Sequence, residues 1–208
     1  MLNKLVNSLK DKSFVLSAGI MRSGSTMMYN ILRRILLIKY GDTLVAGWQN
    51  NMVDLPLGDF YLIKTHNMAP FVKAKPEHIF FTYRDLRTVE VSMNKFFGTP
   101  LSAEAIGYYI LEYYRAKKSG VMIIKYEDLI ADPKSFISII ANSLAITVVN
   151  AGAIHTGDIE YSRETLLHPG HITGTKDNEW RTLMPEDMQK QITQDYSWWF
   201  EECGYAVE

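Results

Sequence analysis

The chain has 208 residues, of which 47% are hydrophobic and 22% charged, values that exclude a disordered chain. Its formal net charge of −1 gives no support to an extended nucleic-acid-binding surface, so any anion site must be local. A single cysteine, Cys203, excludes an intrachain disulfide, and the sequence has no zinc-type ligand cluster. No Pro/Gly/Ser-rich stretch divides the chain, so we predict one domain over residues 1–208.

The first 13 residues are amphipathic, but polar and charged residues interrupt them, so they lack the apolar core of a secretion signal. No other run is long and uncharged enough to span a bilayer. We therefore expect a cytoplasmic protein without an integral membrane segment.

Residues 13–38 predict a strand, a glycine loop and a helix in direct succession. Residues 14–18 are an apolar run, residues 19–24 form a tight loop, and apolar residues recur with helical spacing from Ser25 onward. A helix that begins directly after such a loop points its free amide hydrogens and the positive end of its dipole at the space above Gly24. This element therefore predicts an anion-binding site.

The loop has the frame of a nucleotide phosphate loop, GxxxxGK(S/T), from Gly19 to Thr26. Its lysine position holds Ser25, and Arg22 is the cation instead. Since that lysine contacts the terminal phosphates of a triphosphate, its absence argues against ordinary ATP chemistry. A glycine turn with only a structural role is the alternative interpretation of the loop by itself.

The next apolar runs also end in polar residues. Residues 41–59 are interpreted as an irregular connection, with a loop over the active site as the alternative. Residues 60–63 predict a buried strand followed by Lys64, Thr65 and His66. Because ligands bind outside the carboxyl ends of parallel strands, Lys64 and His66 should share one edge with the glycine loop. A lone histidine is otherwise more often structural.

Residues 78–83 predict a third strand, which ends at Arg84, and residues 86–97 then have helical spacing. Ser92 lies about two helical turns beyond Arg84. The alternative role for Arg84 is an ion pair with Asp85 or Glu90.

Strands and helices continue to alternate toward the C-terminus. Ser102 is a cap for a helix to about Lys117, residues 121–124 predict a fourth strand, and Asp132 with a following proline begins another helix. Residues 145–181 are interpreted as loop, and a final helix begins at Pro185 and ends near Gly204. The alternation predicts an α/β fold of three layers, helices–sheet–helices (αβα), around a mainly parallel central sheet of about five strands.

Taken together, five segments resemble the sulfotransferases that use 3′-phosphoadenosine 5′-phosphosulfate (PAPS). In matching order they are MRSGST at 21–26, KTH at 64–66, TYRDLRTVEVS at 82–92, KYEDLIADP at 125–133, and the region of Trp180 and Arg181 before a C-terminal helix ending in GY. The resemblance implies a P-loop-like sulfotransferase fold. It also implies transfer of a sulfuryl group from PAPS to a hydroxyl or amine, which leaves adenosine 3′,5′-bisphosphate (PAP).

The resemblance also assigns roles to residues of this chain. Arg22 would stabilise the leaving phosphate, His66 would be the general base, and Lys64 would stabilise the sulfuryl oxygens. The donor would be bound at its 5′-phosphate by Arg22, Ser23, Gly24, Ser25 and Thr26, at its 3′-phosphate by Arg84 and Ser92, and near its adenine by Tyr126. No metal is required, because side chains and loop amides meet the negative charge.

One family element departs from the pattern. Where the family has RKGxxGDW, this chain reads TGTKDNEW, which lacks the usual pair of basic contacts to the 3′-phosphate. Lys176 and Arg181 are candidates to replace them. His168 and His171 lie in a loop that could face the acceptor, and a structural role is the simpler interpretation.

Two other function classes remain open at the level of sequence. A nucleotide kinase on the same architecture would bind ATP with magnesium, and a non-catalytic module for a nucleotide or sulfated ligand would need no base at His66. The acceptor could be a small molecule, sugar, lipid or peptide hydroxyl, and neither its identity nor the oligomeric state follows from the sequence.

Overall fold

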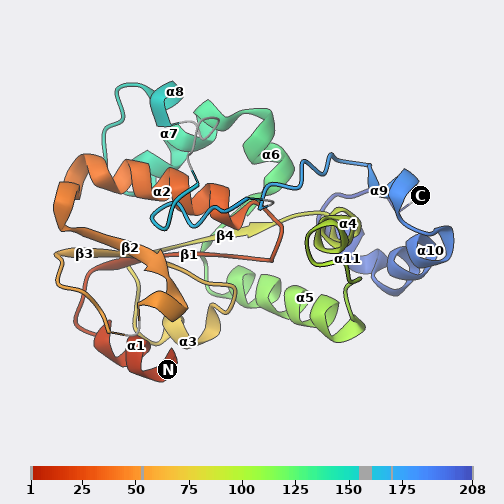
Figure 1. Ribbon diagram of the computed structural model, residues 1–208, viewed down its shortest axis with the longest axis horizontal. Coiled ribbons are helices and arrows are strands. Elements are labelled where there is room, and N and C mark those ends of the chain that lie inside the picture. The colour runs from red at the N-terminus through yellow and green to blue at the C-terminus, as the bar shows by residue number, and fades with distance from the viewer. Residues whose placement is uncertain (1, 53, 155–160, 170, 208) are drawn as a thin grey trace.

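A five-stranded parallel sheet runs through the middle of the molecule, with helices on both faces (Figure 1). The computed structural model describes residues 2–52, 54–154, 161–169 and 171–207. The strand order is β2-β3-β1-β4-β5, and each neighbouring pair is parallel. The strands are β1 (Phe14–Gly19), β2 (Leu44–Trp48), β3 (Phe60–Lys64), β4 (His78–Tyr83) and β5 (Met122–Lys125). This confirms the predicted α/β class.

The helices follow the predicted alternation with the strands. They are α1 (Leu2–Ser8), α2 (Ser25–Tyr40), α3 (Ala69–Val72), α4 (Leu86–Phe97), α5 (Ala103–Lys118), α6 (Tyr126–Ala131), α7 (Pro133–Ser143), α8 (Ala151–Ile154), α9 (Trp180–Leu183), α10 (Glu186–Asp195) and α11 (Ser197–Glu202), with 3-10 turns η1 (Gly41–Thr43) and η2 (Gln49–Asn51). The side chains of Ser102 and Asp132 cap α5 and α7 by accepting backbone N–H bonds, as the sequence predicted.

Each face of the sheet has its own apolar core, because successive strand side chains point to opposite faces. Phe14, Leu16 and Ala18 of β1 pack in a cluster with α1, α3, α5 and the C-terminal helices. Val15 of the same strand packs in the other cluster, with α2 and α7. The central strands β1 and β3 are therefore buried on both sides, which is typical of parallel sheets and explains their continuous apolar runs.

Three segments have a different secondary structure from the one predicted. Residues 41–59 contain β2, an edge strand that pairs only with β3 and is mostly half-buried, so its apolar pattern is weak. The final helix is divided at Tyr196 into α10 and α11. The predicted loop 145–181 contains the short helix α8 and the start of α9, while its residues 155–160 and Gly170 lie outside the described part of the chain.

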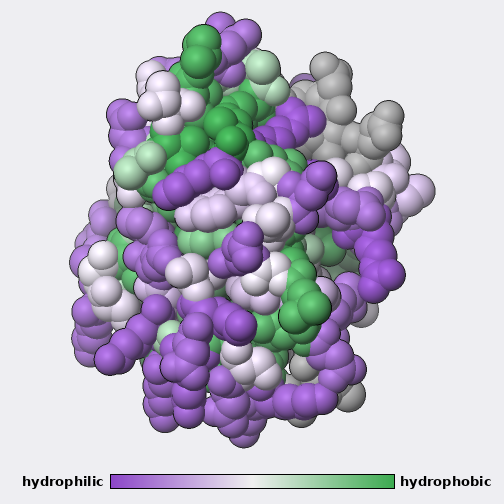
Figure 2. Space-filling view, turned by 90° about the vertical axis from the view of Figure 1, so that its left-hand side faces the viewer, coloured by the Kyte–Doolittle hydropathy of each residue, from purple (hydrophilic) through white to green (hydrophobic). Residues whose placement is uncertain are grey.

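Figure 2 shows the left-hand side of Figure 1, which is largely hydrophilic. Apolar residues gather in the upper part of this view (Figure 2). Ile139 of α7 and Val149, which lies between α7 and α8, have exposed side chains. The carboxyl ends of the strands point the other way in Figure 1, so the candidate site described next lies away from this side. Within the described ranges, no helix has both the length and the apolar character to cross a membrane.

Candidate active site

A cavity of about 710 Å³ lies at the carboxyl ends of β1, β3 and β4. Its lining includes nine residues that the sequence singled out: Arg22, Gly24, Ser25, Thr26, Lys64, His66, Arg84, Ser92 and Tyr126. Among the described residues that line it, Arg22, Lys64, Arg84 and Arg163 are cations and none is an aspartate or glutamate. A protein with a net charge of −1 therefore concentrates positive charge at this one place, as an anion site requires.

Two glycines allow the loop between β1 and α2 to lie close to its neighbours. A Cβ on Gly19 would lie 2.2 Å from Thr82 Oγ1 of β4, and a Cβ on Gly24, whose φ is 77°, would lie 2.4 Å from the Tyr126 ring. Both positions therefore exclude a side chain. No side chain caps the N-terminus of α2, which leaves its first amide hydrogens for an anion.

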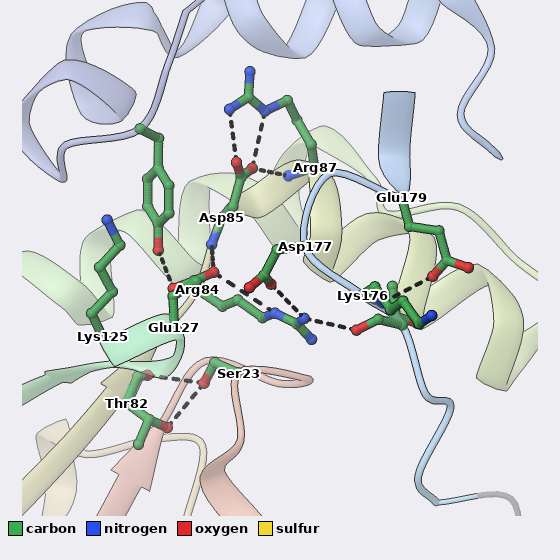
Figure 3. Close-up of polar contacts among 12 residues, drawn as sticks. Ser23, Thr82, Arg84, Asp85, Arg87, Lys125, Glu127, Lys176, Asp177 and Glu179 are labelled. Carbon is green, nitrogen blue, oxygen red and sulfur yellow. Dashed lines mark hydrogen bonds and ion pairs between the residues drawn. The ribbon is translucent and has the colours of Figure 1, made fainter. Parts of the chain in front are cut away.

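Ser23 does not have the role that the resemblance implies. Its side chain is fully buried, and its hydroxyl lies 2.6 Å from Ile20 O, 3.0 Å from Thr82 O and 2.9 Å from Thr82 Oγ1 (Figure 3). The Ser23 amide donates to Ile20 O at 3.3 Å. Because both polar groups are used inside the loop, Ser23 holds the loop on β4 and does not line the cavity, whereas Ser25 and Thr26 do.

Arg22 and Ser92 are in direct contact, although the sequence placed them at opposite ends of a bound donor. Arg22 adopts a φ of 62°, and its Nε donates to Ser92 Oγ at 3.0 Å. Its Nη2 donates to His171 O at 2.7 Å and to Thr173 Oγ1 at 3.3 Å. Burial and then the charge of Arg84 lower the Arg22 pKa. Arg22 is paired with no carboxylate among the described residues, so its charge is not neutralised.

Lys64 is a buried cation at the end of β3. Its side chain is 5% exposed and bonds none of the residues that the structure describes, while its Nζ lies 5.0 Å from the centre of the Trp48 ring. Burial, followed by the nearby charge of Arg22, lowers the Lys64 pKa to about 8. Near neutral pH the ammonium therefore faces the cavity without a counter-ion.

His66 is held in one tautomer by the phosphate loop. Its Nδ1 lies 2.7 Å from Gly19 O, and because a carbonyl oxygen only accepts, Nδ1 carries the hydrogen and Nε2 has a free lone pair. Burial, and then the charge of Lys64, lower the His66 pKa to about 3. The ring is therefore neutral at physiological pH, so Nε2 can accept a proton, but a pKa this low makes His66 a weak base in the free protein.

Arg84 is 4% exposed and lies at the centre of Figure 3. Its Nη2 donates to Thr175 O at 2.8 Å and to Asp177 Oδ1 at 3.0 Å, and its Nε lies 3.8 Å from Glu127 Oε1. The guanidinium lies over the Tyr126 ring at 4.1 Å. The ion pair of Arg84 with Asp85 or Glu90, the sequence alternative, is not formed.

The carboxylate of Asp85 is instead used by another arginine. Arg87 donates to Asp85 Oδ1 at 3.0 Å and to Oδ2 at 2.7 Å, and the Asp85 side chain also caps α4 by accepting the Arg87 N–H. This buried pair packs under Trp180 and Phe200. Asp85 therefore anchors the start of α4 and leaves Arg84 directed at the cavity.

The sequence missed the hydroxyl groups opposite the arginines. Thr173 Oγ1 lies 2.9 Å from both Ser92 Oγ and Thr175 Oγ1, and both threonines line the cavity. The candidates Lys176 and Arg181 do not line it; the Arg181 guanidinium lies over the Trp180 ring. The only sequence signal for Thr173 and Thr175 is their position in TGTKDNEW, the stretch that stands where the sulfotransferases resembled by the sequence have RKGxxGDW.

His168 and His171 form a short chain of hydrogen bonds that reaches the phosphate loop. His171 Nε2 lies 3.0 Å from Thr26 Oγ1, and His171 Nδ1 lies 3.2 Å from His168 Nε2. Burial, followed by the charge of Arg22, lowers the His171 pKa to about 4. Both histidines line the cavity. No group of three or more metal-ligating side chains occurs among the described residues.

Comparison with known proteins identifies the fold. No protein-family model matches the chain, and no curated protein sequence matches it. The crystal structure of mouse sulfotransferase SULT7A1 complexed with PAP superposes with a TM-score of 0.64 over 95% of this chain and 88% of that one. The chain has the sulfotransferase fold. The superposed residues are 15% identical, so the likeness concerns the fold, and the sulfotransferase fold is what the sequence motifs implied.

Proposed function

We propose that this protein is a sulfotransferase that moves the sulfuryl group of PAPS to a hydroxyl or amine acceptor. The observation that carries the proposal is the shared cavity of Arg22, Lys64, His66 and Arg84, which contains cations, a neutral histidine and no carboxylate among its described lining residues. Two further facts support it: the motifs occur in the family's order, and the similar mouse sulfotransferase was crystallised with PAP.

The donor would bind along the edge of the sheet. Its 5′-phosphosulfate would accept hydrogen bonds from the amides at the start of α2 and from Ser25 and Thr26, while Arg84 and Ser92 would bind the 3′-phosphate. Arg22 contacts Ser92 and is close enough to Arg84 for their charges to interact, so the two phosphate pockets adjoin. Tyr126, which contacts Gly24 and underlies Arg84, would lie beside the adenosine.

The reaction would be an in-line displacement at sulfur. The acceptor oxygen forms a bond to sulfur, the bond from sulfur to the bridging oxygen breaks, and that oxygen leaves on PAP. His66 Nε2 takes the acceptor proton, which is possible because Gly19 O holds the hydrogen on Nδ1. Lys64 and Arg22 would stabilise the charge on the sulfuryl oxygens and the leaving phosphate.

Positioning and electrostatics would supply most of the rate acceleration in this scheme, because the side chains form no covalent intermediate. The Tyr108 hydroxyl donates to His66 O at 3.1 Å, and the Trp48 ring lies 5.3 Å from the His66 ring. The Tyr108 bond supports the His66 backbone and Trp48 lies beside the ring, while the bond from Nδ1 to Gly19 O orients the imidazole.

Calorimetry with PAP, and separately with ATP and magnesium, tests the donor assignment. We expect PAP to bind and ATP with magnesium to bind much more weakly, because Ser25 replaces the lysine that contacts the terminal phosphates. A panel of hydroxyl and amine acceptors with labelled PAPS then tests transfer. Preference for ATP with magnesium would favour a kinase, and PAP binding with no transfer to any acceptor would favour a binding module.

A further inference from the structure

Asp177 contacts Arg84, the residue that we assign to the 3′-phosphate, although Asp177 does not itself line the cavity. Its Oδ1 lies 3.0 Å from Arg84 Nη2, and Figure 3 shows the carboxylate directed at the guanidinium. It is held there by the non-helical stretch 171–179, in which the carbonyl oxygen of His171 accepts from Arg22. The same segment supplies Thr175 O to Arg84, so Arg22 and Arg84 are both contacted by one stretch of chain.

Glu127, the other carboxylate near Arg84, is fixed. Its Oε2 accepts from the Tyr205 hydroxyl at 3.0 Å, its Oε1 accepts from the Asp85 amide at 3.4 Å, and its side chain is 19% exposed. Glu127 Oε1 lies 3.8 Å from Arg84 Nε, and Nε has no hydrogen-bond partner among the described residues. Glu127 therefore acts on Arg84 as a steady background charge.

Asp177 is held much less firmly. Its side chain is 40% exposed, and its hydrogen bond to Arg84 is the single one that its carboxylate makes with the described residues. A carboxylate at that exposure is easily rehydrated, so its release from Arg84 costs little. The next residue, Asn178, has a φ of 64°, which places a turn directly after Asp177. The two carboxylates thus differ in mobility although both lie close to the same guanidinium.

We propose that Asp177 is an internal stand-in for the donor's 3′-phosphate, which a bound nucleotide displaces and which returns to Arg84 when the product leaves. The proposal rests on the proposed function, since it takes Arg84 as the 3′-phosphate contact. A phosphate and the Asp177 carboxylate compete for Nη2 of one buried arginine, and two anions on one donor repel each other. Asp177 therefore lowers the affinity for both PAPS and PAP and speeds product release.

The test compares PAP binding by the wild-type protein and by Asp177→Asn. The amide keeps an oxygen that can accept from Arg84 but removes the competing charge. We expect the dissociation constant for PAP to fall about threefold to fivefold, on the scale of one partly exposed ion pair. Stopped-flow displacement should assign most of the change to slower dissociation, and the difference should shrink as salt increases.

Glu179→Gln is the matched control. Glu179 lies on the same segment and also loses one negative charge, but it pairs with Lys95 Nζ at 2.9 Å and accepts from the Lys176 amide, without contacting Arg84. We expect its PAP affinity to stay within about twofold of wild type, as for screened surface charges. Equal tightening in both variants would show a general charge effect and overturn the role of Asp177.

The possible results separate this inference from the proposed function. If the wild-type protein binds PAP and Asp177→Asn binds it equally or more weakly, Asp177 is not a competitor and the sulfotransferase proposal stands. If neither protein binds PAP, both proposals fail. If PAP binding is detectable only in Asp177→Asn, the competing role of Asp177 is supported strongly.

Discussion

The cavity has two walls that are built in different ways. One wall consists of the ends of β1, β3 and β4 with the starts of α2 and α4, and it carries Arg22, Lys64, His66 and Arg84. The other wall consists of residues 162–168 and 171–175, which face the first wall with carbonyl oxygens, hydroxyl groups and histidines. The sheet wall supplies most of the charge, and the loop wall supplies neutral partners for that charge.

The two walls also differ in how their contacts depend on side-chain identity. Lys64 and Arg84 lie at or directly after strand ends whose positions are set by parallel pairing: Lys64 is opposite Ser17, and Tyr83, which precedes Arg84, is opposite Lys125. The contacts of the loop wall are made largely by backbone oxygens, as from His171 and Thr175, which do not depend on side-chain identity. Substitutions in the sheet wall should therefore change the reaction much more than substitutions in the loop wall.

The largest effect is expected at His66. His66→Ala should lower kcat by about a hundredfold or more, the usual scale for loss of a general base. PAP affinity should change little, because the proposed role of Nε2 is toward the acceptor. His78→Asn is the control, since His78 is the first residue of β4, at the amino end of the strand and away from the cavity that the carboxyl ends form. Equal turnover of the His66→Ala and wild-type proteins with saturating donor would remove His66 from the mechanism.

Arg84 is the next test of the sheet wall. Arg84→Ala removes a charged hydrogen-bond donor, so we expect PAP to bind about 10- to 100-fold more weakly. Arg84→Lys should restore part of the affinity, because an ammonium keeps the charge but not the planar contact with Tyr126. Calorimetry measures both, and circular dichroism melting checks that each variant is folded. Wild-type affinity in Arg84→Ala would place the 3′-phosphate elsewhere.

The pH dependence tests the second cation of the sheet wall. Burial lowers the Lys64 pKa to about 8, so Lys64 is charged below that pH and neutral above it. In the free enzyme the donor kcat/KM should therefore fall as the pH rises through about 8, by up to about tenfold per pH unit. Lys64→Arg stays protonated, so its decline should shift to higher pH. His66, with a pKa of about 3, should add no decline between about pH 5 and 7.

The smallest effect is expected in the loop wall. Thr173→Val removes a hydroxyl that accepts from Arg22 and contacts Ser92, and one neutral hydrogen bond corresponds to about a two- to tenfold loss of donor kcat/KM. Thr182→Val is the control, because its hydroxyl bonds Glu179 O away from the cavity. A loss as large as that of Arg84→Ala would contradict the division between the two walls.

Local pattern was enough to predict most of the sheet wall. Apolar runs predict four of the five strands. Because polar residues follow these runs directly, the sequence also predicts that Lys64, His66 and Arg84 lie at the carboxyl ends of the strands, where they line the cavity. The missed strand, β2, is an edge strand with a glycine and mostly half-buried residues, so it has neither a continuous run nor strict alternation.

The loop wall has no such local signal. Its contacts to Arg22 join residues 149 and 151 positions apart, and its contact from Thr175 O to Arg84 joins residues 91 positions apart. The use of the Ser23 hydroxyl inside the loop is equally nonlocal, since its partner Thr82 is 59 positions away. Pairings at these separations follow from how the whole chain packs.

By itself, the sequence determined the order of strands and helices, the glycine loop before α2 and the polar residues at the strand ends, because each depends on neighbouring residues along the chain. Only the tertiary structure decided which oxygen each arginine contacts, which nitrogen of His66 carries the hydrogen, and that Asp177 rests on Arg84. The physical reason is range: periodicity and loop geometry act within a few residues, whereas a buried charge is paired by whatever the complete fold brings within hydrogen-bonding distance.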